Sequence, residues 1–215
     1  MTRMSKVVCV SGIDGSGKSM LVEALEQHAL KNGLAVKVRW LRFNHFFTRP
    51  LLIACRLFGA TRYQTQNGHR VGKHHFARPR WLAWLFETLQ YWDAWRVAHI
   101  HLNRRSLRRT DLLILDRYVP DILVDISIAT ENPALLRSAR AEKFFNLLPS
   151  GSLILGVQRA EEALLICRPE SGVDPTFTAR SDAYLQSFSR GEIHLLKNDG
   201  SPEELLEHAL KVLGK

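Results

Sequence analysis

The chain has 215 residues, of which 46% are hydrophobic and 24% charged, so it is long enough for one domain with a sizeable core and is not disordered or collagen-like. Lysine and arginine number 30 against 21 acids, a formal net charge of +9 at pH 7. No apolar run has the roughly 18 residues of a membrane span, and the first, residues 7–10, is too short for a signal peptide, so we expect a cytoplasmic protein. The cysteines Cys9, Cys55 and Cys167 have no paired ligand spacing and are interpreted as buried thiols.

The first predicted strand, residues 7–11, leads into a glycine-rich loop. Residues 12–19 fit the pattern G-x-x-x-x-G-K-[ST] in full, and a predicted helix over 19–31 follows. In such a loop the backbone N–H groups surround phosphate oxygens, the lysine reaches the β- and γ-phosphates and the serine binds Mg²⁺. A glycine-rich turn with a solvated lysine is the alternative, but it does not explain the position between strand and helix. The residues of this loop predicted to bind a nucleoside triphosphate are Gly12, Asp14, Gly15, Ser16, Gly17, Lys18 and Ser19.

A basic stretch follows the second predicted strand, residues 35–41. Residues 39–80 contain nine lysines and arginines and no acid, so the remaining 21 basic residues balance the 21 acids of the whole chain. Four histidines and seven aromatic residues lie in the same stretch. We predict an anionic partner here: a multiply charged phosphate, a nucleic acid or an anionic membrane. The plainer alternative is an amphipathic helix over 49–62 that packs on the body of the protein.

A long helix is predicted over residues 80–107, followed by a strand over 112–115. Asp116-Arg117-Tyr118 comes directly after that strand, at the end where ligands gather in parallel sheets. There Asp116 would hold Mg²⁺ and Arg117 would bind a phosphoryl group. The alternative is a surface turn with a local Asp–Arg pair.

Two more strands are predicted at residues 153–157 and 193–196, and a last helix begins at Ser201-Pro202. Residues 170–178, with one glycine and one proline and a second proline directly before them, are the best candidate for a mobile loop. Apolar strands that alternate with helices predict a single α/β domain over residues 1–215, a three-layer sandwich around a parallel five-stranded sheet.

Several motifs resemble, in order and spacing, those of the thymidylate kinase family. They are the phosphate loop with its internal Asp14, the triplet after residue 115, residues 155–167 with the arginines that follow, and residues 198–204. The resemblance covers most of the chain except the divergent basic segment 42–80. It implies a P-loop nucleoside monophosphate kinase-like fold, a short mobile lid at about residues 159–180, and ATP- and Mg²⁺-dependent transfer to an acceptor phosphate. Family members often dimerise through helices, which makes the helix over 80–107 a candidate surface for a homodimer.

The resemblance also assigns roles on the acceptor side. Asp14 would contact the acceptor's sugar, Arg96 and Arg117 its phosphate, and Trp92 its base. Trp92 and Arg96 are four residues apart and share one helix face. Plain core packing for Trp92, and a solvated or ion-paired Arg96, are the alternatives. Arg42 and Tyr118 complete the predicted acceptor site.

The lid would supply the cation that stabilises the transferring phosphoryl group. The candidates are Arg159, Arg168 and Arg180, of which Arg168 is the first choice. A cation at a helix end is the alternative interpretation of Arg168. Gly15 stands where one branch of the family has a cation in the phosphate loop, so the catalytic charge has to come from the lid.

Three departures from the family pattern concern mainly the acceptor. Met20 replaces a hydroxyl residue, Ala98 replaces a polar one, and in residues 40–50 only Arg42 could correspond to the family's acceptor loop. Three functions therefore stay open: a nucleoside monophosphate kinase with thymidylate as the default acceptor, a kinase of a sugar, lipid-linked alcohol or nucleic-acid end, and a nucleotide-responsive binding module.

Overall fold

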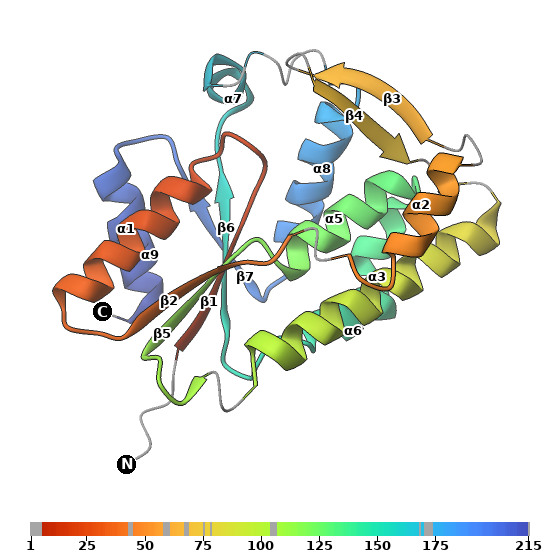
Figure 1. Cartoon of the computed structure of the whole chain (residues 1–215). Helices are drawn as coiled ribbons and strands as arrows, with labels where there is room; N and C mark the ends of the chain where they lie inside the picture. The colour runs from red at the N-terminus through yellow and green to blue at the C-terminus, as the bar shows by residue number, and fades with distance from the viewer. Residues whose placement is uncertain are drawn as a thin grey trace.

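The computed structural model describes residues 6–42, 45–57, 61–66, 69–74, 76–77, 79–103, 107–167, 169 and 174–214, with the backbone alone for 61–66 and 69–74. Five strands form its central sheet (Figure 1). They are β1 (Lys6–Ser11), β2 (Val36–Trp40), β5 (Leu112–Asp116), β6 (Leu153–Gln158) and β7 (Ile193–Lys197), in the spatial order β2-β5-β1-β6-β7. Every neighbouring pair is parallel. The predicted five-stranded parallel sheet is therefore confirmed, with each strand within one residue of its expected ends.

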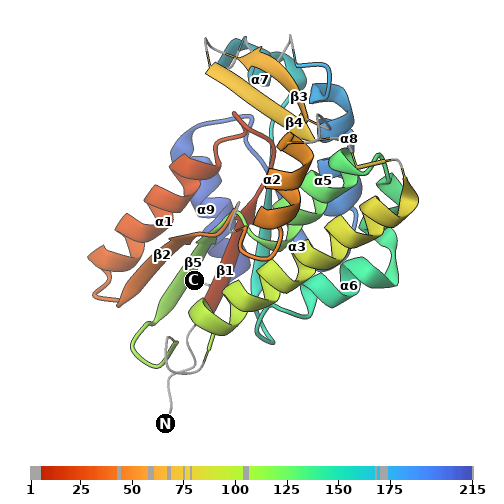
Figure 2. The ribbon, with the colours of Figure 1, turned by 45° about the vertical axis from the view of Figure 1, so that its right-hand side comes forward.

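Helices cover both faces of this sheet, as Figures 1 and 2 show. One face packs against α1 (Lys18–Lys31) and α9 (Pro202–Leu213), and the other against α3 (Arg80–His101), α5 (Val119–Ala129), α6 (Ala139–Phe145) and α8 (Phe177–Phe188). Val8 and Val10 belong to the core beneath α1 and α9, whereas Val7 and Cys9 belong to the opposite core. Successive strand residues point to opposite faces, so a sheet covered on both sides needs apolar residues throughout. The three-layer sandwich is confirmed.

Helix ends follow the local sequence. The hydroxyl of Ser201 accepts a hydrogen bond from the Glu204 backbone N–H at 3.2 Å, as its position before Pro202 predicts. The long helix α3 ends at His101, earlier than predicted, because the Asn103 side chain donates to the carbonyl oxygens of His99 and Ile100 at 2.7 and 3.1 Å.

The basic segment forms structures outside the main sheet. It contains α2 (Arg49–Leu57) and an antiparallel pair of strands, β3 (Thr61–Gln66) and β4 (His69–His74), at the same end of the molecule as α7 (Glu161–Cys167) (Figure 1). Cys55 of α2 packs into the core, as expected for a helix on the body of the protein, while β3 and β4 were not predicted. A 3₁₀ helix, η1 (Pro133–Arg137), connects α5 to α6.

The structure corrects one expectation about the cysteines. Cys9 and Cys55 are buried, but Cys167 is exposed, and Arg159 donates a hydrogen bond to its sulfur at 3.0 Å. Of the predicted lid, Arg168 and residues 170–173 lie outside the described residues. In the described part of the chain, no helix is long and apolar enough to cross a membrane.

Candidate active site

The glycine-rich loop connects β1 to α1 at the carboxyl edge of the sheet. Gly12 has a φ of +152°, and a Cβ there would collide with the carbonyl oxygen of Val157. Gly17 has a φ of +100°, and a Cβ there would collide with the side chain of Asn198, which donates to the Ser16 carbonyl at 2.8 Å. Only glycine fits this backbone without strain, so the ends of β6 and β7 hold the loop in shape.

Lys18 lies buried inside this loop. Its Nζ donates to the carbonyl oxygen of Ile13 at 2.5 Å and lies 3.9 Å from Oδ1 of Asp14. Burial, followed by the charge of Arg117, lowers the pKa of Lys18 to about 8. The next residue, Ser19, is exposed in the first turn of α1. An ammonium group and a free hydroxyl are thus presented together with the N-terminus of a helix, an arrangement that can bind phosphate.

Asp116 is the last residue of β5, next to β1 in the sheet. Its Oδ1 is buried and has no hydrogen-bond partner, and burial raises the pKa of this carboxyl against the opposing charges of Arg117 and Lys18. An oxygen ligand left unsatisfied in this position fits Mg²⁺, which takes one or two carboxylates and completes its shell with phosphates and water. Among the residues that the structure describes, no group of three His, Cys, Asp or Glu side chains could hold a metal ion by itself.

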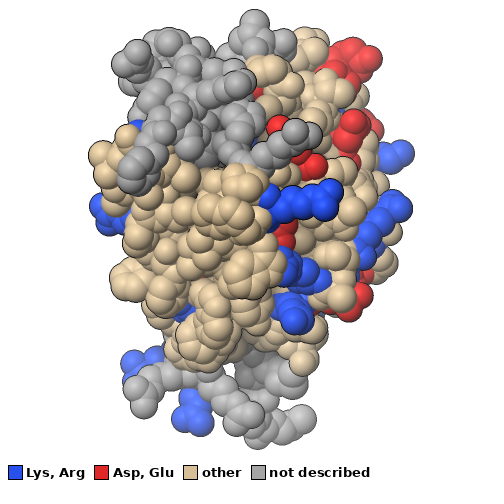
Figure 3. All heavy atoms as spheres, turned by 90° about the vertical axis from the view of Figure 1, so that its right-hand side faces the viewer, with Lys and Arg blue, Asp and Glu red and all other residues tan. Residues whose placement is uncertain are grey.

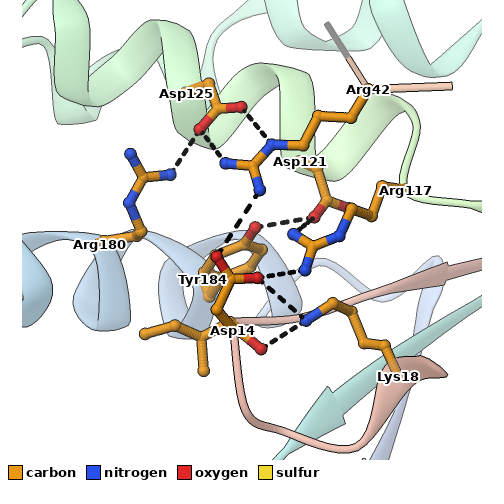
Figure 4. Close-up of polar contacts among 9 residues, drawn as sticks. Asp14, Lys18, Arg42, Arg117, Asp121, Asp125, Arg180 and Tyr184 are labelled. Atoms are coloured by element: carbon orange, nitrogen blue, oxygen red, sulfur yellow. Dashed lines mark hydrogen bonds and ion pairs between the residues drawn. The ribbon is translucent and has the colours of Figure 1, made fainter. Parts of the chain in front are cut away.

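Arg117 has a left-handed backbone, with φ of +62°, and its guanidinium contacts two carboxylates. It forms an ion pair with Asp14 and a 3.3 Å contact from Nη1 to Oδ1 of Asp121 (Figure 4). Burial alone would raise the pKa of Asp14, but the charges of Arg117 and Lys18 lower it to about 2. An unusual backbone conformation at a non-glycine residue is typical of a functional site.

A second carboxylate on α5 joins two further arginines. Asp125 accepts hydrogen bonds from Nε and Nη2 of Arg42, each 2.8 Å long, and from Nη1 of Arg180 at 2.5 Å. One turn before it, Asp121 accepts a 2.8 Å bond from the hydroxyl of Tyr184. The cluster, drawn in Figure 4, consists of Asp14, Lys18, Arg42, Arg117, Asp121, Asp125, Arg180 and Tyr184. It joins the phosphate loop to the segment after β2 and to α5 and α8.

Some predicted acceptor residues lie outside this cluster. The hydroxyl of Tyr118 donates to the carbonyl of Ala94 at 2.7 Å, and the side chain is fully buried, so it fastens α3 to the start of α5. Trp92 is 45% exposed and packs edge-on against Tyr91 and Trp95. It therefore does not belong to the packed core.

Arg96 connects α3 to the segment before α2. Its guanidinium lies 4.9 Å above the ring of Phe46, and its Nε is buried without a hydrogen-bond partner. Asp93 on the same helix accepts hydrogen bonds from the backbone N–H groups of Phe46, Phe47 and Thr48 at 2.8, 2.7 and 3.0 Å. The basic segment is thus fastened to α3 just before α2 begins.

Sequence reasoning missed Asp121, Asp125 and Tyr184. The two aspartates were detectable as acids four residues apart in the otherwise apolar run of α5, directly after Asp116 and Arg117. Acids in a buried helix need nearby cations, which is a signal of function or of a structural ion pair. Tyr184 gives no such signal.

No protein-family model matches the sequence, and no curated protein matches it significantly. Solved structures do match, and what they share with this chain is the fold, an α/β sandwich with a P-loop. The thymidylate kinase of Candida albicans has a TM-score of 0.56 and 12% identity, over 98% of this chain and 92% of that chain. For the thymidylate kinase of Ehrlichia chaffeensis the TM-score is 0.54 and the identity 13%, over 98% of this chain and 99% of that chain. The predicted thymidylate kinase-like fold is therefore confirmed, as a likeness of fold.

Proposed function

We propose that this chain is a kinase that transfers the γ-phosphoryl group of ATP, with Mg²⁺, to a small acceptor. The observation that supports this best is the complete phosphate loop at the carboxyl edge of the sheet, beside the unsatisfied Oδ1 of Asp116 and three arginines. A glycine-rich turn of purely structural use would not need a buried lysine, because burying a charge costs free energy. A cytoplasmic location, where ATP is available, belongs to the same proposal.

On the donor side, the loop N–H groups from Gly12 to Ser19 would surround the phosphates, with Lys18 on the β- and γ-phosphates. Contacts with the Ile13 carbonyl and with Asp14 keep the Nζ of Lys18 inside the loop. Mg²⁺, bound by Ser19 and Asp116, would neutralise charge on the phosphates when present. Positioning and charge neutralisation suffice for phosphoryl transfer, so no covalent enzyme intermediate is needed.

The catalytic cations would be Arg117 and a lid arginine. Arg117 already lies beside the phosphate loop through its pair with Asp14. Arg168 remains the first choice for the lid, and Arg180 is a second because it reaches the same cluster from α8. Their charges would stabilise the equatorial oxygens of the transferring group once water is excluded.

A nucleoside monophosphate, with thymidylate as the default, is the acceptor that the fold favours. Arg117 and Arg96 would bind its phosphate, and the unpartnered Nε of Arg96 is a donor that a ligand could satisfy. Asp14, 41% exposed in its side chain, is available to a sugar hydroxyl, and the exposed face of Trp92 to a base. Tyr118 would contribute indirectly, because its hydrogen bond to the Ala94 carbonyl holds α3 in place.

The test is ADP release from ATP and Mg²⁺ with a panel of deoxy- and ribonucleoside monophosphates. The wild type should show stimulation by at least one monophosphate, and Lys18→Ala should abolish it. Lys31→Ala, an exposed lysine at the end of the same helix, is the matched control and should keep the wild-type rate. Near-native activity of Lys18→Ala would overturn the assignment.

A second acceptor class, an alcohol such as a sugar, a lipid-linked alcohol or a nucleic-acid end, is favoured by one observation. Arg42, which alone could replace the family's acceptor loop, is held by Asp125 through two hydrogen bonds. If no monophosphate stimulates an enzyme that binds ATP, the panel extends to these alcohols. Salt-sensitive binding to nucleic acid or anionic vesicles would connect the basic segment 39–80 to the acceptor.

We also propose a homodimer that forms through α3. Trp81 and Trp84 are 64% and 56% exposed on this helix. Figure 3 looks onto the side of the molecule that carries α2 and α3, and much of that face is uncharged. An apolar surface of this kind is typical of protein contacts.

A further inference from the structure

Asp125 forms an unusually complete ion pair at the edge of the proposed acceptor side. It accepts three hydrogen bonds of 2.5 to 2.8 Å from Arg42 and Arg180, which come from the segment after β2 and from the first turn of α8. The side chains of Asp125, Arg42 and Arg180 are 22%, 10% and 23% exposed. The three side chains are thus partly screened from water but keep some exposed surface. Figure 4 shows how they contact one another.

The arginines of this cluster are already engaged with carboxylates. In the described part of the cluster, Arg42 and Arg180 contact Asp125, and Arg117 contacts Asp14 and Asp121. The remaining amino group of Arg42, Nη1, lies 3.9 Å from Oδ2 of Asp14. A phosphate needs the same in-plane guanidinium donors that a carboxylate occupies. An incoming phosphate therefore competes with an internal anion.

We propose that Asp125 is a specificity-determining residue that acts as the resident counter-ion of Arg42 and Arg180. Its carboxylate lowers the affinity of this side of the site for phosphate groups, because a phosphate can bind these arginines only where it displaces Asp125. The inference rests on the proposed function in one respect, that this side of the cluster receives the acceptor. The inference holds for either acceptor class, since Asp125 lowers the affinity for a phosphate ester and leaves the affinity for an alcohol unchanged.

Asp125→Asn isolates this effect. The amide keeps the size of the side chain and one accepting oxygen but loses the negative charge. Two guanidiniums then have no full counter-charge, and a phosphate dianion can bind them without displacing a carboxylate. We expect the affinity for inorganic phosphate to increase at least tenfold.

The experiment is a calorimetric titration of inorganic phosphate into protein whose phosphate loop is saturated with a non-hydrolysable ATP analogue and Mg²⁺. The wild type should bind phosphate weakly, and Asp125→Asn at least tenfold more tightly. Asp182→Asn, which removes an exposed acid from α8, is the matched control for net charge and should behave as the wild type. Equal or weaker phosphate binding in Asp125→Asn, including no binding in either protein, would overturn the proposal.

Failure of the proposed function is visible separately, because the analogue is titrated first. If the wild type does not bind the analogue, the proposed assignment of the donor site is incorrect. The phosphate titration is then repeated in a Lys18→Ala background. The two side chains at position 125 are still compared there, with the same outcomes.

Removing one member of a partly buried ion pair can destabilise the fold. The double variant Arg42→Gln/Asp125→Asn keeps the net charge and replaces the pair with two amides, while Arg180 loses its carboxylate. Circular dichroism checks that each variant is folded. If the single variant does not fold, the double variant decides: phosphate binding tighter than in the wild type supports the proposal, and unchanged binding overturns it.

Discussion

Lys18 is buried next to Arg117, and this placement controls its charge. The pKa of its amine falls from 10.5 to about 8, first through burial and then through the arginine. Negative phosphates would raise the pKa of Lys18 again. Above pH 8 the amine therefore has to take up a proton when a nucleotide binds. Affinity for a nucleotide and the protonation of one lysine are therefore linked.

The affinity for Mg²⁺ and an ATP analogue should be nearly constant from pH 7 to 8 and then fall as the pH rises, because the neutral amine no longer attracts phosphate. The decrease should approach about tenfold per pH unit. Dissociation constants measured between pH 7 and 9.5 check this. Lys18→Arg, which stays charged throughout, should show a flat profile. A flat wild-type profile would show that Lys18 does not meet the phosphates.

Individual residues of the site differ in how far the sequence reveals them. Lys18, Ser19 and Asp116 follow from motifs that are local in the chain, and the structure places all three at one edge of the sheet. The partners Arg42 and Asp125 are 83 residues apart, and no spacing rule relates them. Only the folded chain brings these two residues together. Sequence motifs therefore predict the residues of the donor side far better than those of the acceptor side.

At the scale of elements, Asp93 is the side chain that connects the basic segment to the core. It is 3% exposed, and its carboxylate accepts three backbone N–H groups from residues 46–48, directly before α2. These donors precede a helix and have few other acceptors. This carboxylate therefore helps to fix the start of α2, and with it the acceptor side, in addition to the packing of Cys55 into the core.

Asp93→Ala should therefore lower the free energy of unfolding by about 3 kcal/mol, since buried backbone donors lose a charged acceptor. Urea denaturation gives the value. The exposed Asp182→Ala is the matched control and should change it by less than about 0.5 kcal/mol. Equal losses in the two variants would contradict the role given to Asp93.

The elements that the sequence predicted well are those with a strong apolar pattern. The five strands of the sheet are apolar because they are buried on both faces, and their ends could be read to within one residue. β3 and β4 lie outside that sheet and lack such a pattern, so they were missed. A signal was present, because Asn67-Gly68, between these strands in the sequence, is a pair typical of two-residue hairpin turns.

At the scale of the whole molecule, the exposed tryptophans of α3 are the feature that a single chain does not explain. Side chains of this size lose contact with water at a stable interface, and aromatic residues are enriched there. We therefore expect the protein to sediment as a dimer at micromolar concentration.

Trp84→Glu should shift the protein toward the monomer, because a dimer would bury the new charge without a partner. Analytical ultracentrifugation measures the distribution. Leu30→Glu, an exposed apolar residue on α1 at the opposite face of the sheet, is the control and should leave the dimer intact. A wild type that is monomeric at 100 µM would contradict the proposed interface. This concentration is about a hundredfold above a micromolar dissociation constant, so even a weak dimer would be populated.

The central claim is that this site transfers a phosphoryl group and does not merely bind or hydrolyse a nucleotide. Phosphorus NMR of the reaction with ATP, Mg²⁺ and the best acceptor measures this directly, because it follows the γ-phosphorus into its product. The account predicts one phosphorylated acceptor for each ADP formed, and no product with Lys18→Ala. ADP accompanied by an equal amount of inorganic phosphate, whatever acceptor is present, would contradict it.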